Sequence, residues 1–319
     1  MALTHTRYFL GVDVGSSKTH AMVADQNGQV CGFGQAGAGN HEGVGYSGLQ
    51  AALKAASGKA LAEAGLNPAD IAGAGFGVSG YDWPSERVDT LNAIAAIGLN
   101  CPVETVNDAI LGLVAGARAG WGVAVVAGTG CNCWGWDVHR RIGHVTGAGE
   151  HMGEAAGAYE VVDAAVARIS RAWSLRGPVT RLTEAFIAQT GAKDQEDLIE
   201  GLIMERYSID ARSAQLVFQV AEDGDPVARE VIAWAGEALA DLAVGVIHQL
   251  HFERLDFEVV LVGSLYNGGT LTIEPMRSAI QRVAPGASLV RLEAPPVVGG
   301  VLLGMLQTGV DPSGVRESL

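Results

Sequence analysis

The sequence is poor in the features that mark secreted or membrane-bound proteins. Only 4 of its 319 residues are cysteines, and they form no pattern typical of a disulfide framework. Cys131 and Cys133 lie too close together for an ordinary zinc pair, and no second pair accompanies them. The apolar stretch at the N-terminus is too short for the core of a signal peptide, and no apolar run reaches membrane-spanning length. We therefore predict a cytoplasmic protein with reduced thiols and no membrane partner.

Basic residues are also scarce. Lysine and arginine number 21 against 35 aspartates and glutamates, which gives a formal net charge of −14. Because no cluster of lysine and arginine interrupts this acidity, we expect no nucleic-acid partner. The same acidity offers no general attraction for a phosphate ligand. Any such ligand must be held by the local geometry of the backbone.

Glycine and small apolar residues, in contrast, are abundant. The chain contains 44 glycines and is 48% hydrophobic, but only 6% of its residues are aromatic. This balance favours an α/β protein with tight turns and with small residues where helices meet sheets. The chain is long enough for two packed lobes.

Apolar runs and glycine-containing turns alternate in an order that repeats once. In the first half the pattern predicts a hairpin at 8–14 and 19–25, a strand at 29–34, a helix over 46–64, a strand at 73–78, a helix over 85–97 and a strand at 103–106. In the second half it predicts a hairpin at 121–127 and 132–137, helices over 152–173 and 214–250, a strand at 257–262 and a helix at 299–306. Within the long helical region, Asp225 is expected to cap a helix that begins at Pro226. Both halves open with the same strand–turn–strand design, so we predict two lobes of like topology around a cleft.

Turns at the heads of the two predicted hairpins are candidate phosphate loops. Their residues are Gly15, Ser16, Ser17 and Lys18 in the first turn and Gly128, Thr129 and Gly130 in the second. Successive N–H groups in such turns can form an anion-binding nest, although the first turn is no Walker A loop. The alternative for both is a structural hairpin turn. Asp13, a carboxylate inside an apolar strand, would be costly there without a counter-charge or a metal ion, which favours a role in holding magnesium.

Four polar segments are further candidates for the site. Asn107 and Asp108 stand between a predicted strand and a predicted helix, where Asp108 could cap the helix or, as a side chain at the mouth of a cleft, act as a base. The others are Asn40-His41, Ser79–Asp82 and Gly147–Glu154. The alternatives are simple turns for Asn40-His41 and Ser79–Asp82, and a helix cap or a zinc site for Gly147–Glu154.

Taken together, these motifs resemble the N-acetylglucosamine kinase branch of the BadF/BadG/BcrA/BcrD ATPase family, within the actin–hexokinase–heat-shock ATPase superfamily. The resemblance runs from about Tyr8 to Leu306 and keeps the order of the family's motifs. The family's phosphate loops, D-G-G-G-T-K-T and G-T-G-S-N, are similar to 13–19 and 128–132. Its catalytic N/T-D-A and adenosine V-G-S motifs are similar to 107–109 and 262–264.

This resemblance implies an α/β fold of two actin-like (ribonuclease H-like) lobes, each a mixed sheet flanked by helices, with the active site in the cleft between them. We expect residues 1–107 plus 297–319 to form the N-terminal lobe, with the first phosphate loop and the sugar-binding loops. Residues 108–296 are expected to form the C-terminal lobe, with the second phosphate loop and the adenosine site. We also expect a homodimer.

The implied function is that of an ATP-dependent sugar kinase. It transfers the γ-phosphate of ATP to a hydroxyl, typically the 6-hydroxyl, of N-acetylglucosamine, glucosamine or a related sugar, with ATP and Mg²⁺ as cofactors. Asp108 is implied as the general base, and Asp13 as the residue that holds magnesium through water. The implied ATP-binding residues are Gly15, Ser16, Ser17, Lys18, Gly128, Thr129, Gly130, Gly263, Ser264 and Gly268. The implied substrate-binding residues are Asn40, His41, Ser79, Gly80, Asp82, Asn107, Asp108, Gly147, Ala148, Gly149 and Glu154.

One loop departs from the family pattern G-W-G-x-x-x-G-D-E-G-S. Ala148 stands at the tryptophan, Glu154 at the aspartate and Ala155-Ala156-Gly157 at Glu-Gly-Ser. These changes leave the identity of the sugar open. They also support an alternative, a sugar-sensing regulatory ATP-binding protein with little or no turnover. A second alternative, the ATPase activator of a radical dehydratase, would need cysteines after the helix-start loops, and none follows Cys133.

Overall fold

The apolar runs of the first half form a five-stranded sheet. The computed structural model describes residues 6–319, and the strands of this sheet are β1 (Tyr8–Val14), β2 (Thr19–Asp25), β3 (Val30–Ala36), β4 (Ile71–Val78) and β5 (Val103–Val106). Their order is β3-β2-β1-β4-β5. The first three pair antiparallel, whereas β4 and β5 run parallel to β1. The sheet is therefore mixed.

The second half repeats this topology. Its strands are β6 (Gly122–Ala127), β7 (Cys131–Trp136), β8 (Ile142–Val145), β9 (Phe257–Val262) and β10 (Ala287–Arg291). Reading the sheet as β8-β7-β6-β9-β10 reproduces the order and the directions of the first sheet. The prediction of two lobes of like topology is confirmed, although the sequence analysis did not predict β8 or β10.

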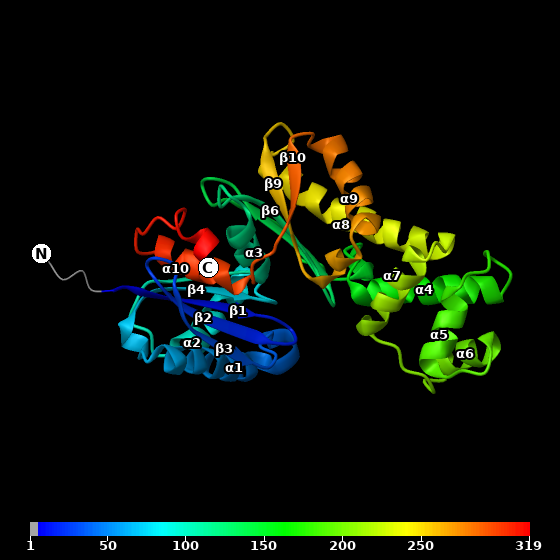
Figure 1. The fold of residues 1–319 in the computed structure, drawn as a ribbon, viewed down its shortest axis with the longest axis horizontal. Coiled ribbons are helices and arrows are strands. Elements are labelled where there is room, and N and C mark those ends of the chain that lie inside the picture. Colours follow the sequence, from blue (N-terminus) through cyan, green and yellow to red (C-terminus); the bar gives the residue numbers. More distant parts are fainter. Residues whose placement is uncertain (1–5) are drawn as a thin grey trace, which may run out of the picture.

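Helices cover both faces of the first sheet (Figure 1). These helices are α1 (His41–Ala64), α2 (Arg87–Ala95), α3 (Asp108–Gly116) and α10 (Val297–Leu306). Leu10, Val12 and Val14 share a buried cluster with α1 and α2, while α10 lies on the opposite face against β1 and β4. A Cβ at Gly11 would stand 2.5 Å from the backbone nitrogen of Val301. Glycine is required there because α10 lies directly against the backbone of the sheet.

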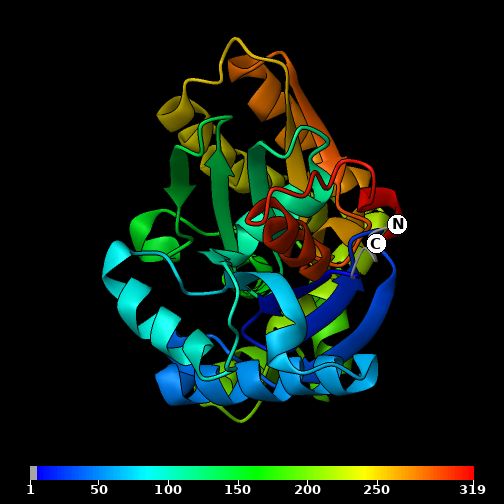
Figure 2. The ribbon, with the colours of Figure 1, turned by 90° about the vertical axis from the view of Figure 1, so that its left-hand side faces the viewer.

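Helix α3 joins the two lobes. It contacts α10, strands β1 and β4 of the first sheet and strands β6, β7 and β9 of the second. Its side chains share one buried cluster with α10 and with Trp134 and Trp136 of β7. Figure 2 shows the two sheets stacked above one another with these helices between them. The boundaries of the predicted lobes at 107 and 297 stay predictions.

The second lobe carries an additional group of helices, on the right in Figure 1. Its helices are α4 (Ala158–Trp173), α5 (Leu182–Thr190), α6 (Gln195–Ile203), α7 (Ala214–Glu222), α8 (Pro226–Leu250) and α9 (Thr270–Val283). As predicted, Asp225 caps α8, because its carboxylate accepts a hydrogen bond of 2.8 Å from the N–H of Ala228. The helix predicted over 152–173 begins only at Ala158, since Gly153 has a left-handed backbone with φ 74°.

Helix α8 corrects one expectation. By length and composition alone it is long and apolar enough to cross a membrane, with a mean hydropathy of 1.5 over its most apolar window. In the structure it packs against α4, α7, α9 and strands β6, β7 and β8, and 56% of that window is buried inside the protein. We therefore interpret α8 as the core helix of the second lobe.

Candidate active site

A cleft with a cavity volume of about 430 Å³ draws its lining from both lobes. Most of the residues singled out in the sequence meet there. They are Asp13, Gly15, Ser16, Ser17, Lys18, Asn40, Ser79, Gly80, Asp82, Asp108, Gly128, Thr129, Gly130 and Gly147. The cavity is also lined by residues that were not proposed as site residues, among them Glu42, Cys131, Asn132 and Thr146.

The two candidate phosphate loops occupy equivalent positions in the two sheets. The first connects β1 to β2, and the N–H of Gly15 donates to the carbonyl of Lys18 at 2.9 Å. The second connects β6 to β7, and the N–H of Gly128 donates to the carbonyl of Gly130 at 2.9 Å. Ser16, Ser17 and Lys18 remain exposed toward the cavity. The arrangement can hold an anion between two turns that belong to different lobes.

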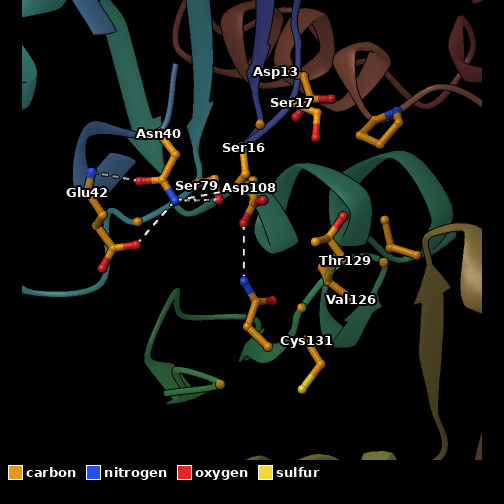
Figure 3. A pocket seen from close by; sticks show the side chains of 18 of the residues that line it. Asp13, Ser16, Ser17, Asn40, Glu42, Ser79, Asp108, Val126, Thr129 and Cys131 are labelled. Carbon is orange, nitrogen blue, oxygen red and sulfur yellow. Dashed lines mark hydrogen bonds between the residues drawn. The ribbon is translucent and has the colours of Figure 1, made fainter. Parts of the chain in front are cut away.

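Asp108 is the first residue of α3, and it does not cap the helix. Asn107 does so, since its side-chain oxygen accepts from the N–H of Ala109 at 2.9 Å. The carboxylate of Asp108 is thus available to the cavity, where the amide of Asn132 donates to it at 3.3 Å (Figure 3). Burial raises the pKa of Asp108 to about 6, partly offset by hydrogen bonds from Asn132 and Ala109. A carboxylate with such a pKa is suited to accept a proton near neutral pH.

Asp13 lies at the end of β1, beside the first loop. Burial raises its pKa to about 7, the charge of Asp108 adds to this effect, and Lys18 opposes it. A divalent cation would relieve this repulsion, so the residues present fit magnesium. Within residues 6–319, no three potential ligands gather into a metal-binding group, and neither Glu154 nor its neighbours supply a zinc site. Asp13 would share the ion with water and phosphate oxygens.

The other end of the cavity is polar and acidic. Asn40 caps α1, and its amide nitrogen lies 3.3 Å from the hydroxyl of Ser16 and 3.2 Å from the carboxylate of Glu42 (Figure 3). Asp82 accepts a hydrogen bond of 2.8 Å from Asn107. Burial raises the pKa of Asp82 to about 7, with further contributions from the charges of Asp108, Glu42 and Glu86. Hydroxyl groups of a ligand would find both donors and acceptors here.

Several expected substrate-binding residues do not line the cavity. Asn107 acts through Asp82, and the ring of His41 stacks on Tyr46 with centroids 4.5 Å apart. One carboxylate oxygen of Glu154 accepts three hydrogen bonds from its own loop, from the hydroxyl of Thr146 at 3.1 Å and from the N–H groups of Gly147 at 2.8 Å and Ala148 at 2.9 Å. Glu154 therefore shapes the loop that brings Gly147 to the cavity. Ala148 and Gly149 belong to the same loop but are absent from the lining within the described chain.

A second cavity of about 430 Å³ adjoins the first at Gly128 and Thr129, which line both. It also includes Ser264 and Gly268, two of the expected adenosine-site residues, whereas Gly263 is absent from the lining described. Arg212, Phe218 and Gln219 complete one wall. The sequence analysis missed this wall because its residues lie on a helix and in the turn before it without a recognisable motif.

Aromatic side chains join the lobes near the acidic end of the first cavity. Trp83 directly follows Asp82 in the first lobe, and its ring meets the edge of His144 on β8 with centroids 5.8 Å apart. His144 in turn stacks on the buried ring of Trp134 at 4.4 Å. Gln249 of α8 holds the backbone of His144 through two hydrogen bonds of 2.8 and 3.0 Å. The second lobe therefore holds its side of the contact in place by hydrogen bonds, whereas the first lobe contributes Trp83 from a loop.

Comparisons with known proteins agree with this architecture. Residues 10–304 match the sequence profile of the BadF/BadG/BcrA/BcrD ATPase family. An N-acetyl-D-glucosamine kinase of Dictyostelium discoideum is 24% identical over 310 residues, covering 93% of this chain and 97% of the relative. An N-acetylmuramic acid/N-acetylglucosamine kinase of Clostridium acetobutylicum is 21% identical over 301 residues, covering 93% and 98%. The crystal structure of a candidate N-acetylglucosamine kinase from Chromobacterium violaceum has a TM-score of 0.66 at 21% identity, with coverage of 93% and 98%. The predicted fold of two actin-like lobes, each a mixed sheet flanked by helices, is confirmed.

Proposed function

Because the chain belongs to the BadF/BadG/BcrA/BcrD ATPase family, we propose that it is an ATP-dependent carbohydrate kinase acting on an amino sugar. The observation that carries the proposal is that one cavity unites Asp108 with both phosphate loops and continues into a second cavity at Gly128. Phosphoryl transfer needs this combination of positioning and charge neutralisation more than it needs covalent chemistry. The two relatives named as N-acetylglucosamine kinases direct the proposal to sugars of this type.

The reaction divides among the residues as follows. Asp108 accepts the proton of the acceptor hydroxyl, typically the 6-hydroxyl, as its oxygen forms a bond to the γ-phosphorus and the bond to the β-phosphate oxygen breaks. The N–H groups of the two phosphate loops, with Ser16, Ser17, Lys18 and Thr129, bind the phosphates. Asp13 would hold magnesium through water. When bound, magnesium supplies charge neutralisation on the phosphate oxygens.

The two ends of the cleft bind different substrates. Ser264 and Gly268 receive the adenosine in the second cavity, and Gly263 forms the turn that precedes them. The sugar occupies the acidic end of the first cavity, among Asn40, Ser79, Gly80, Asp82 and Gly147. Asn107 and Glu154 position these contacts through Asp82 and the loop of Gly147, whereas His41, Ala148 and Gly149 are absent from the lining described.

The test is an ADP-release assay with Mg²⁺-ATP and a panel of amino sugars, N-acetylated amino sugars and hexoses. We expect ADP release that depends on one class of sugar, with a phosphorylated sugar as product by mass spectrometry. Saturable sugar binding without any product would support the sugar-sensing alternative instead. Release of ADP at the same rate with and without every sugar would contradict the kinase assignment.

A further inference from the structure

The second lobe contains a third cavity, of about 280 Å³, apart from the two cavities of the cleft. It lies between the C-terminal part of α4, the segment that follows it and the first turn of α8. Its lining is rich in arginine and consists of Arg168, Arg171, Arg176, Gly177, Pro178, Val227 and Glu230. No residue of this cavity takes part in the proposed phosphoryl transfer.

The charge of this cavity is unusual for this protein. Three guanidinium groups face a single carboxylate, that of Glu230, in a chain whose formal net charge is −14. In the part of the chain that the structure describes, no ion pair involves any of the three arginines. The C-terminal end of α4 accounts for Arg171, because cations are favourable in the last turn of a helix. It does not account for Arg176, which lies beyond the helix.

Local hydrogen bonds position two of the guanidinium groups. Arg171 donates to the carbonyl of Arg176 at 2.9 Å, and Arg176 donates to the hydroxyl of Ser174 at 2.7 Å. Each guanidinium has five N–H donors, so most of them remain for a ligand. Val227 brings the first turn of α8 to the same cavity, and Asp225 caps this helix. The carboxylate of Asp225 accepts hydrogen bonds from the hydroxyl of Thr180 and from the N–H groups of Arg181 and Ala228. It is not part of the lining described for this cavity.

We propose that this cavity binds a phosphate group, either inorganic phosphate or the phosphate monoester of a small metabolite. The lining carries an excess of two positive charges, which matches a phosphate of about −1.5 to −2 at neutral pH. Guanidinium groups are the side chains best suited to bidentate binding of phosphate. The site does not depend on the proposed kinase function.

Helix α4 connects this cavity to the second phosphate loop. Its first residues donate to that loop, Ala158 to the carbonyl of Gly128 at 2.9 Å and Tyr159 to the carbonyl of Thr129 at 3.3 Å. Its last turns carry Arg168 and Arg171. The helix has 16 residues and is about 24 Å long. A phosphate that holds the C-terminal part of α4 therefore also biases the position of the nucleotide loop, and we expect it to change the affinity for ATP.

The binding test is calorimetric titration at low ionic strength, with the cleft saturated by a non-hydrolysable ATP analogue. The probes are inorganic phosphate and glucosamine 6-phosphate, which distinguish a free ion from a monoester. In the double variant Arg168→Ala/Arg171→Ala we expect about tenfold weaker binding of at least one probe than in the wild type. Arg254→Ala removes an exposed charge from the same lobe and is the matched control, with wild-type affinity. Equal affinity in all three proteins, or no binding to the wild type, overturns the proposal.

Two further measurements complete the test. Hydrogen exchange of the wild type should show protection of 168–178 by the bound probe, a result that does not require any variant to fold. The KM for ATP should change with the probe in the wild type and in Arg254→Ala but not in the double variant. Absence of protection overturns the site, and an unchanged KM in the wild type overturns the coupling through α4.

Discussion

Three carboxylates in one cavity share an unfavourable environment. Burial raises the pKa of Asp13 to about 7, of Asp82 to about 7 and of Asp108 to about 6, and the charge of Asp108 adds to the effect at Asp13 and Asp82. Among the described residues 6–319, Lys18 alone brings a positive charge to this lining. A cation or a hydrogen-bonding ligand would relieve the repulsion among these carboxylates, and such raised pKa values are typical of functional sites.

Replacement of the proposed base tests the chemistry directly. In Asp108→Asn we expect kcat to fall by about 10²–10⁴-fold, because the amide cannot accept the hydroxyl proton. The affinity for ATP should stay within a few-fold, since the nest residues are unchanged. Steady-state kinetics gives the first quantity and calorimetry the second. A variant that kept most of its kcat would leave Asp108 with only a structural role.

Replacement of Asp82 tests the electrostatics through stability. The folded state raises the pKa of Asp82 from 3.8 to about 7, so folding binds a proton between these values and the stabilising effect is lost as the pH rises. Asp82→Asn removes this titration and can still accept from Asn107. We expect the Tm of the variant to equal that of the wild type near pH 4 and to exceed it near pH 8. A difference in Tm that does not grow with pH would argue against the raised pKa.

Sequence motifs identified some residues of the candidate site and missed others. Motifs singled out both candidate phosphate loops, Asp13 and Asp108, and the structure brings these residues to one cavity because each stands near the end of a strand. Motifs could not reveal that Glu154 binds its own loop, since the length of its side chain decides this and one methylene separates it from aspartate. Glu42 was missed because it lies in the first turn of α1, which Asn40 caps, and an acidic residue is common there without any role in a site.

At the scale of elements, α4 rests on the second phosphate loop. A Cβ at Gly157 would lie 2.5 Å from the Cα of Gly130, so the start of the helix touches the loop backbone. In contrast, a Cβ at Gly130 would meet no atom within 4 Å. Gly157 must therefore be small because it packs against the loop backbone. At Gly130 the protein itself leaves room for a side chain.

This difference yields a paired prediction. Gly130→Val should fold with a Tm near that of the wild type, yet lose ATP binding, because only a bound phosphate would meet the new side chain. Gly157→Val should lower the Tm by several degrees, because the loop and α4 must move apart. Thermal melts and nucleotide titrations on both variants supply the measurement. Normal ATP affinity in folded Gly130→Val would contradict the phosphate-loop assignment.

Sequence patterns identified some elements much better than others. The strands at 8–14, 19–25, 103–106 and 257–262 were predicted with their observed bounds, because apolar runs end there at clear turn residues. Strand β8 was missed, since its residues Ile142–Val145 are few and partly exposed. Helices α5 and α6 have only nine residues each, and α9 contains Pro275, so none of the three offers a long uninterrupted helical pattern.

At the scale of the whole molecule, the aromatic contact between Trp83 and His144 links the two lobes beside the acidic end of the cleft. An aromatic pair contributes about 0.5–1.5 kcal/mol, or about 2- to 12-fold in the population of the state that contains it. In Trp83→Ala we expect the KM for the sugar to rise by a factor in this range, with little change in the KM for ATP. Trp83→Phe keeps an aromatic ring and should restore most of the effect. Identical sugar KM values in all three proteins would exclude a role of the Trp83 contact in sugar binding.

The position of α10 has a consequence for the way the protein is made. Strands β1 and β4 end at Val14 and Val78, but the helix that covers their second face begins only at Val297. A ribosome must therefore synthesise the entire second lobe before the first sheet is complete. Until then, α3 covers this apolar face of the sheet only in part, and the rest is the kind of surface that aggregates or recruits chaperones during translation. The last short helix thus decides when the earliest part of the chain becomes stable.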